Sequence, residues 1–218
     1  MRSWLIFWLL LVIPLLAIPL DRYESSVAAY EAADRLKAPQ PGGTLFLGSS
    51  TFTLWGQDLE REFSLFHALN RGFGGATIAE IDHYLERVCF PYQPRLILFY
   101  AGTNDIADGH SPQQVVSDFA HLTAHLRQKL PNTRVAYVSM AMPPSRIRFE
   151  REYASANQLL REFTQEQPNM DYLDVSKLLL DDQGRPRGQF YREDQLHMKP
   201  SGYALWAPVL REYLEEHQ

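Results

Sequence analysis

Five short apolar segments recur along the chain, and each is followed by a stretch with a different periodicity. They lie at 44–48, 65–69, 95–101, 134–140 and 170–175, and their apolar residues are mostly uninterrupted. Continuous apolar runs of this length are typical of strands that are buried on both faces of a parallel sheet. The pattern therefore predicts five parallel strands.

The stretches between these strands carry apolar residues at i, i+3 and i+4, which is the pattern of a helix with one buried face. Four such stripes run from Ile78 to Val88, from Val115 to Leu130, from Phe149 to Phe163 and from Tyr203 to Tyr213. Ser111 and Pro112 give the second helix a favourable start, an N-cap followed by proline in the first turn. Repeated strand-then-helix units predict an α/β fold, a three-layer α/β/α sandwich around a five-stranded parallel sheet.

The chain before the first strand has two parts of different character. Residues 4–20 form an uncharged, almost wholly apolar run that follows Arg2. Residues 21–43 contain a weakly amphipathic stretch that ends at prolines and glycines, which is typical of a linker. We therefore expect an N-terminal membrane anchor or signal segment at 1–20, a linker at 21–43 and one domain at 44–218.

The apolar run allows two interpretations. It is short for a helix that crosses a bilayer, since about 20 residues are usually needed, and a basic start with an apolar centre also fits a secretory signal peptide. A cleavage site is hard to find, because Ala17 has Leu15 before it and Pro19 soon after it. We favour an uncleaved anchor. Both interpretations predict a periplasmic or extracellular domain, membrane-anchored or, if residues 1–20 are cleaved, secreted.

Composition and charge exclude some function classes. The chain has 218 residues, of which 45% are apolar and 22% charged, as in an ordinary globular domain. A formal charge of −5 argues against a nucleic-acid partner, because a phosphate-binding surface leaves a basic excess. Cys89 is the single cysteine, so the sequence allows neither an intrachain disulfide nor a thiolate metal cluster. The oligomeric state stays open.

Chemically versatile residues follow three of the predicted strands. Ser50 follows the first strand, Gly75 follows the second and Asn104 follows the third. In an open parallel sheet the carboxyl ends of the strands meet at one edge, where ligands bind. Asp194 and His197 lie between the fifth strand and the last helix and can reach the same edge. We therefore expect all five residues to form one site.

These residue types suit nucleophilic catalysis. A serine hydroxyl such as that of Ser50 needs a base, and His197 can take its proton while Asp194 orients the imidazole. The developing oxyanion needs fixed donors, for which the backbone N–H of Ser50, the backbone N–H of Gly75 and the side-chain amide of Asn104 are suitable. This chemistry requires no metal or organic cofactor. Two histidines on one predicted helix, His121 and His125, lie opposite its apolar stripe and are expected to be solvated.

Four segments resemble, in order and at compatible spacing, the sequence blocks of the SGNH (GDSL-like) hydrolase superfamily. The segments are Gly48-Ser49-Ser50, Asn70 to Thr77, Gly102-Thr103-Asn104-Asp105, and Asp194 with His197, within roughly residues 44–215. The glycine block is most similar to the branch with platelet-activating-factor acetylhydrolase catalytic subunits and bacterial esterases. The resemblance implies a flavodoxin-like five-stranded fold and a serine esterase that acts on lipid or carbohydrate esters with short acyl or acetyl groups.

The resemblance assigns Ser50 as the nucleophile, Asp194 and His197 as its partners in a catalytic triad, and Gly75, with Gly74 as a near alternative, as an oxyanion donor. One residue departs from the family pattern, because Ser49 stands where an aspartate usually precedes the nucleophile. This departure leaves open a catalytically idle module that binds glycan or lipid at the cell envelope. O-acyl transfer to a sugar is the other alternative.

Residues around the expected site are candidates for substrate contact. Tyr100, Trp55, Phe73 and the segment 140–144 could line an acyl pocket, although simple packing explains each aromatic equally well. Arg146 and Arg148 lie just beyond that segment and could contact an anionic leaving group.

Overall fold

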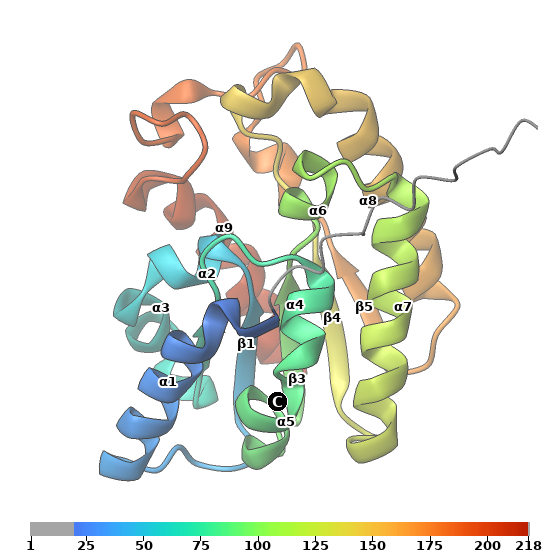
Figure 1. Ribbon diagram of the computed structural model, residues 1–218. Coiled ribbons are helices and arrows are strands. Elements are labelled where there is room, and N and C mark those ends of the chain that lie inside the picture. Colours follow the sequence, from blue (N-terminus) through green and yellow to red (C-terminus); the bar gives the residue numbers. More distant parts are fainter. Residues whose placement is uncertain (1–19, 218) are drawn as a thin grey trace, which may run out of the picture.

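The protein is described by a computed structural model, in which residues 20–217 are placed (Figure 1). Its sheet contains β1 (Thr44–Gly48), β2 (Leu69–Gly72), β3 (Leu96–Tyr100), β4 (Arg134–Val138) and β5 (Met170–Leu173). All neighbouring strands are parallel, and their order is β2-β1-β3-β4-β5. This is the flavodoxin-like order, so the predicted five-stranded parallel sheet is confirmed.

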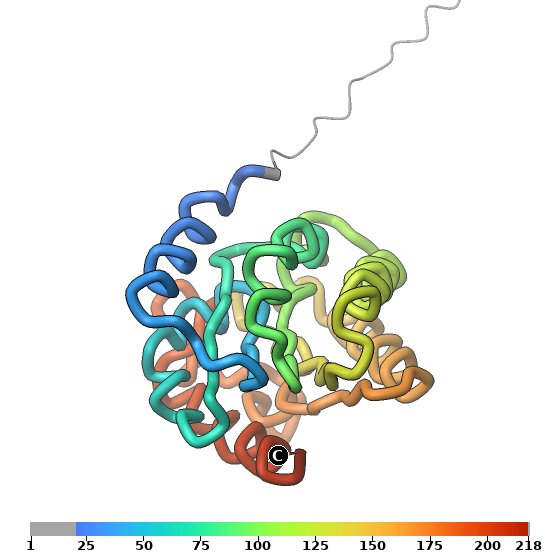
Figure 2. Tube along the Cα trace, turned by 90° about the horizontal axis from the view of Figure 1, so that it is seen from below, coloured from blue at the N-terminus to red at the C-terminus, as the bar shows by residue number. Residues whose placement is uncertain are grey.

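Helices cover both faces of the sheet, and the strand side chains alternate between the two. Leu45 and Leu47 belong to one apolar core and Phe46 to the other. The first core is covered by α1 (Glu24–Leu36), α4 (Ile78–His83), α5 (Leu85–Val88), α7 (Pro112–Lys129) and α8 (Glu150–Gln165), and the second by α2 (Ser50–Trp55), α3 (Gln57–Glu62) and α9 (Pro200–Glu216). Figure 2 shows α1 and α9 on opposite sides of the sheet, which confirms the three-layer sandwich.

The four predicted apolar stripes all lie on helices. The first stripe is divided between α4 and α5, and the other three correspond to α7, α8 and α9. Helix α7 starts as expected, because Ser111 and Gln114 form a reciprocal capping box and Pro112 occupies the first turn.

The prediction of the second strand at 65–69 is wrong. Ser64–Phe66 forms a 3-10 turn in which Phe66 is buried while Leu65 is exposed, and β2 begins only at Leu69. The two middle residues of this edge strand, Asn70 and Arg71, are polar but buried, and their side chains find partners in neighbouring segments. The buried Arg71 side chain contacts Asp34 and Tyr92. An apolar pattern cannot locate such a strand. The other four strands agree with the expected bounds to within two residues.

The segment expected as a linker packs onto the domain. It forms α1, as its amphipathic pattern indicates, but Val27 is fully buried and the Tyr30 hydroxyl donates to the Gly72 carbonyl. Arg87 on α5 pairs with Glu24 and Glu31. Burial and ion pairs therefore hold residues 24–36 against the sheet layer.

The predicted anchor or signal segment at 1–20 lies outside the described residues, except for its last position. Among residues 20–217, no helix combines the length and the apolar character that a membrane crossing requires.

Candidate active site

Ser50 lies at the carboxyl edge of the sheet, where the chain turns from β1 into α2. The preceding residue fixes this turn, because the Ser49 amide donates to the Tyr100 carbonyl at 2.9 Å and the Ser49 carbonyl accepts from Phe52 N at 3.1 Å. Ser49 is fully buried, whereas Ser50 is half-buried and reaches the surface of a groove. The turn therefore presents the hydroxyl of Ser50, and not that of Ser49, to a ligand.

Asp194 and His197 lie on a tight loop that precedes α9. An antiparallel bridge between Tyr191 and Met198 closes this loop. One carboxylate oxygen of Asp194, Oδ1, accepts from the amides of Leu196 and His197, both at 2.9 Å. The other oxygen lies 2.7 Å from His197 Nδ1. Asp194 therefore fixes both the backbone of the loop and the imidazole ring, and Nε2 is left for other partners.

The electrostatics of this pair favour an ionised aspartate. Partial burial opposes the charge, but hydrogen bonds from His197 N, the His197 ring and Leu196 N outweigh it and lower the pKa of Asp194 to about 2. A carboxylate at this position accepts a hydrogen bond from Nδ1–H and stabilises the imidazolium form of His197.

Candidate donors for an oxyanion lie in the loops after β2 and β3. Gly75 has a φ of +84°, and its amide makes none of the hydrogen bonds recorded among residues 20–217. Asn104 lies on α6 (Thr103–Ala107) and is nearly buried, and its Nδ2 donates to the Ala76 carbonyl at 3.0 Å. An amide nitrogen has two hydrogens, so one N–H of Asn104 is left for a ligand.

The segment before β1 supports the loop that follows β2, residues 72–77, here called the glycine loop. The Tyr23 hydroxyl donates to the Gly74 carbonyl at 3.2 Å, and the Tyr30 hydroxyl donates to the Gly72 carbonyl. Arg22 Nη2 lies 3.2 Å from the position that a Cβ on Gly75 would occupy. A side chain at residue 75 would therefore crowd Arg22, besides adopting a left-handed backbone conformation that favours glycine.

The structure brings Ser50, Gly75, Asn104 and His197 to a single groove of about 510 Å³. A smaller recess of about 30 Å³ adjoins it, and Ser50, Asn104 and His197 line this recess as well. Asp194 lies behind the His197 ring. Among the hydrogen bonds of the described residues, none joins Ser50 to the ring, and such contacts commonly tighten only when substrate binds.

The other residues that were expected to contact substrate lie in different parts of the structure. Tyr100, Ala141 and Pro143 line the recess beside Ser50. Trp55 lies in a separate hollow and Phe73 is buried in the core, so neither contributes to this recess.

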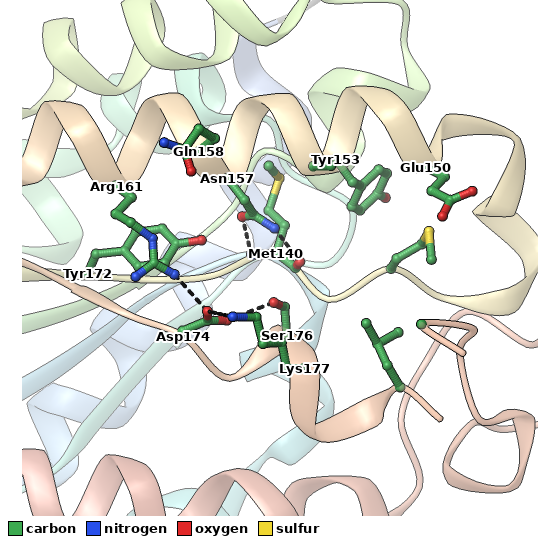
Figure 3. Close-up of a pocket in the computed structure, with 14 residues that line it drawn as sticks. Met140, Glu150, Tyr153, Asn157, Gln158, Arg161, Tyr172, Asp174, Ser176 and Lys177 are labelled. Atoms are coloured by element: carbon green, nitrogen blue, oxygen red, sulfur yellow. Dashed lines mark hydrogen bonds and ion pairs between the residues drawn. The ribbon is translucent and has the colours of Figure 1, made fainter. Parts of the chain in front are cut away.

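A second cavity of about 300 Å³ lies on the other side of the segment 140–143 (Figure 3). Met140 and Met142 face it, because alternate residues of this extended segment point to opposite sides. Its polar groups are largely paired with one another, since Asp174 binds Arg161 at 2.6 Å and Asn157 binds the Met140 backbone. The cavity is separate from the groove that contains Ser50.

Arg22 in the groove and Tyr191 in the recess are among the lining residues that were not predicted from the sequence. Arg22 precedes α1, in a segment that looks like a linker, and only the folded chain brings it beside Gly75. Tyr191 lines the recess and has no motif around it.

One group of side chains among the described residues could hold a metal ion. Ligand atoms of Asp105, His110 and Asp118 lie within 4.8 Å of one another, although none of the three lines the groove. Asp105 is fully buried, and its Oδ1 accepts from Ile78 N at 3.0 Å. Asp105 therefore caps the start of α4, next to the glycine loop. His121 is solvated as expected, with 80% of its side chain exposed. The expectation is wrong for His125, which is only 29% exposed because its ring packs edge-on against Phe90 and its Nδ1 lies 2.9 Å from Asp82 Oδ1.

Asp105→Asn is expected to change how stability depends on pH. Burial raises the pKa of Asp105 to about 6, and the hydrogen bond from Ile78 N only partly opposes this. The folded state then binds more protons than the unfolded state between the ordinary carboxyl pKa and about 6, so stability falls as pH rises through that window. The asparagine variant keeps an acceptor for the Ile78 amide but has no ionisable group at this position. It should therefore not show the loss of unfolding free energy that the wild type shows, which amounts to up to about 3 kcal/mol.

Urea unfolding of both proteins from about pH 4 to about pH 7 measures the difference. The variant should gain on the wild type as pH rises, and parallel curves would contradict the expectation. Asp182→Asn, at an exposed position, controls for the loss of one carboxylate.

Comparisons with known proteins show the family and the fold of the chain. The model of the GDSL-like lipase/acylhydrolase family matches residues 39–205. No curated protein matches the sequence. Among the solved structures that share the fold, three serve as examples. A protein from Streptococcus pneumonia provisionally described as a platelet activating factor has a TM-score of 0.78 and 20% identity, over 89% of this chain and 94% of its own.

The second structure is a GDSL-like lipase from Bacteroides thetaiotaomicron, with a TM-score of 0.74 and 16% identity over 92% of this chain and 98% of its own. The third is a carbohydrate esterase of family 3 from Talaromyces cellulolyticus, with a TM-score of 0.61 and 15% identity over 79% of this chain and 98% of its own. At these identities the likeness shows the fold.

Proposed function

The chain belongs to the GDSL-like lipase/acylhydrolase family and is a hydrolase, and from this premise we propose that it is a serine esterase that acts on carboxylic esters through an acyl-enzyme intermediate. One observation carries the proposal. The Asp194–His197 pair, joined at 2.7 Å, shares a groove with Ser50, Gly75 and Asn104. This arrangement supplies a nucleophile, an oriented base and oxyanion donors in one place.

In the proposed reaction, Ser50 Oγ attacks the carbonyl carbon of the ester and its proton passes to His197 Nε2. The ionised Asp194 stabilises the imidazolium that forms. The oxyanion of the tetrahedral intermediate accepts hydrogen bonds from the amides of Ser50 and Gly75 and from Asn104 Nδ2. His197 then gives its proton to the departing alcohol.

In the second half of the reaction, a water molecule attacks the acyl-enzyme and His197 takes its proton. The acid leaves, and Ser50 recovers its hydroxyl hydrogen from His197. With the ester and one water molecule as reactants, Ser50 and His197 account for every proton that moves in these steps.

The recess beside Ser50 supports a short acyl group. Its volume of about 30 Å³ corresponds to only two or three water-sized spheres, and Tyr100, Ala141 and Tyr191 form its walls. An acetyl group fits this space, whereas a long acyl chain does not. The wider groove of about 510 Å³ remains for the alcohol part of the substrate, which we propose to be a lipid or a carbohydrate.

A series of p-nitrophenyl esters tests the proposal. We expect the acetate to be hydrolysed, with kcat/KM at least about tenfold lower for the octanoate, because each extra methylene must find space outside the recess. A fluorophosphonate probe should label the protein on Ser50. A protein that hydrolyses none of the esters and is not labelled would contradict the proposal and favour the idle binding module.

A further inference from the structure

Arg146 lies at the centre of the proposed catalytic edge without being one of the reacting groups. It belongs to the 3-10 segment η4 (Pro144–Phe149), which follows β4. The half-buried side chain lines both the groove and the recess that Ser50 and His197 share. Arg146 therefore lines the same groove and recess as the proposed nucleophile and base.

The guanidinium makes two hydrogen bonds to α6. Arg146 Nη1 donates to the Thr103 carbonyl at 2.7 Å, and Nη2 donates to Asn104 Oδ1 at 3.0 Å. Two adjacent residues of one short helix are thus held by one planar group. A forked donor of this kind fixes direction as well as distance, which a lysine ammonium does not.

These contacts determine the orientation of the Asn104 amide. Its oxygen accepts from Arg146, and one hydrogen of its Nδ2 is donated to the Ala76 carbonyl. A rotated amide would place nitrogen against the cation and oxygen against the carbonyl, so both contacts would become repulsive. The remaining N–H of Asn104 is therefore kept available to the groove.

The charge of Arg146 also matters. Among the ion pairs of the described residues, none joins Arg146 to a carboxylate. Its acceptors are a neutral carbonyl and a neutral amide, so its positive charge is not cancelled by a close partner. A cation hydrogen-bonded to Asn104 Oδ1 withdraws electron density from the amide and makes its N–H a stronger donor.

We infer that Arg146 is a positioning residue, which holds and polarises Asn104 so that its free N–H stabilises the oxyanion; this inference rests on the proposed esterase function. The structure does not support Arg146 and Arg148 as a joint site for an anionic leaving group. Arg148 is exposed and lies over the Phe149 ring at 4.6 Å, whereas Arg146 binds α6.

The test compares Arg146→Ala and Arg146→Lys with Asn104→Ala on a neutral ester, p-nitrophenyl acetate. Loss of one oxyanion donor typically lowers kcat by about 10²–10³-fold. We expect a decrease of this order for Asn104→Ala and for Arg146→Ala, with KM changed by less than about threefold, because the contact acts in the transition state. Arg146→Lys should recover little of the loss. Arg148→Ala is the control and should keep wild-type kcat.

Two further measurements separate positioning from a general structural role. The double variant Arg146→Ala/Asn104→Ala should be no slower than Asn104→Ala, because both changes remove the same donor. Millimolar guanidinium should restore part of the kcat of Arg146→Ala and none of the kcat of Asn104→Ala. Thermal unfolding of each variant checks that the domain remains folded.

Results that contradict the role of Arg146 differ from results that contradict the proposed esterase function. If the wild type is active, the inference alone would be overturned by either of two results. One is a wild-type kcat for Arg146→Ala, and the other is an additive decrease in kcat when Arg146→Ala and Asn104→Ala are combined. An effect confined to KM for anionic esters would also overturn it, because it would indicate direct substrate contact. A wild type without esterase activity or fluorophosphonate labelling would overturn the proposed function, and the inference with it.

Discussion

Ser50→Ala is expected to lower kcat for ester hydrolysis by about 10⁶-fold, because a hydrolase of this kind loses nearly all of its catalysis when the nucleophile is removed. The hydroxyl of Ser50 is presented to the groove at the turn between β1 and α2. Alanine leaves the turn intact, since Ser49 makes the hydrogen bonds that fix it. Activity and fluorophosphonate labelling should disappear together while the unfolding temperature stays near that of the wild type.

The adjacent serine provides a matched control. Ser49 is fully buried, and its Oγ has no hydrogen-bond partner among the described residues. Removing an unsatisfied buried hydroxyl costs little stability, so Ser49→Ala should retain both activity and fold. Substantial turnover in Ser50→Ala, or its loss only in Ser49→Ala, would show that the nucleophile is wrongly assigned. The control also measures whether the residue that departs from the family pattern matters for catalysis.

Asp194→Asn is expected to lower kcat by about 10⁴-fold, which is the usual effect of replacing the orienting carboxylate of a triad by an amide. Asp194 Oδ2 lies 2.7 Å from His197 Nδ1 and accepts a hydrogen bond from it. An amide nitrogen at this position would donate instead, so the ring would turn or adopt the other tautomer. Either change removes the base from Ser50.

The asparagine variant separates this effect from disruption of the loop. Its oxygen can still accept from the amides of Leu196 and His197, which Asp194 Oδ1 binds at 2.9 Å in the wild type. Steady-state kinetics should therefore show a large fall in kcat with little change in KM. Glu193→Gln, at an exposed neighbouring position, is the control for loss of charge. Equal activities of Asp194→Asn and wild type would remove Asp194 from the site.

The low pKa of Asp194 also determines the acid pH range in which its protonation lowers the stability of the protein. Because the pKa is lowered to about 2 in the folded state, the carboxylate contributes stability above its ordinary pKa. That contribution is lost as pH falls through the window between the ordinary value and about 2. Loss of activity nearer to neutral pH therefore has another cause than protonation of Asp194.

The sequence predicts the central part of the fold because strands buried on both faces leave continuous apolar runs. Four of the five strands are found within two residues of their expected bounds. The rule that ligands bind at the carboxyl ends of parallel strands then places Ser50, Gly75 and Asn104 at one edge, as the structure shows. The pattern of apolar residues and the topology of a parallel sheet are together sufficient to predict these strands and this edge of the site.

What the sequence does not reveal depends on contacts between distant residues. Strand β2 is polar because the Arg71 side chain pairs with Asp34 across 37 positions of the chain. Arg146 and Asn104 are 42 positions apart, and no local pattern indicates that they meet. Such pairs have no periodicity, so an edge strand or a positioning residue is visible only when the chain is folded.

The contacts of the glycine loop have a consequence for comparing relatives. The family match begins at residue 39, yet Tyr23 and Tyr30, which support this loop, lie upstream of it. Two proteins with identical catalytic blocks can therefore differ in turnover through changes in a helix that alignments of those blocks never include. A gene fragment trimmed to the matched region would encode every reacting group and still omit part of what holds them in place.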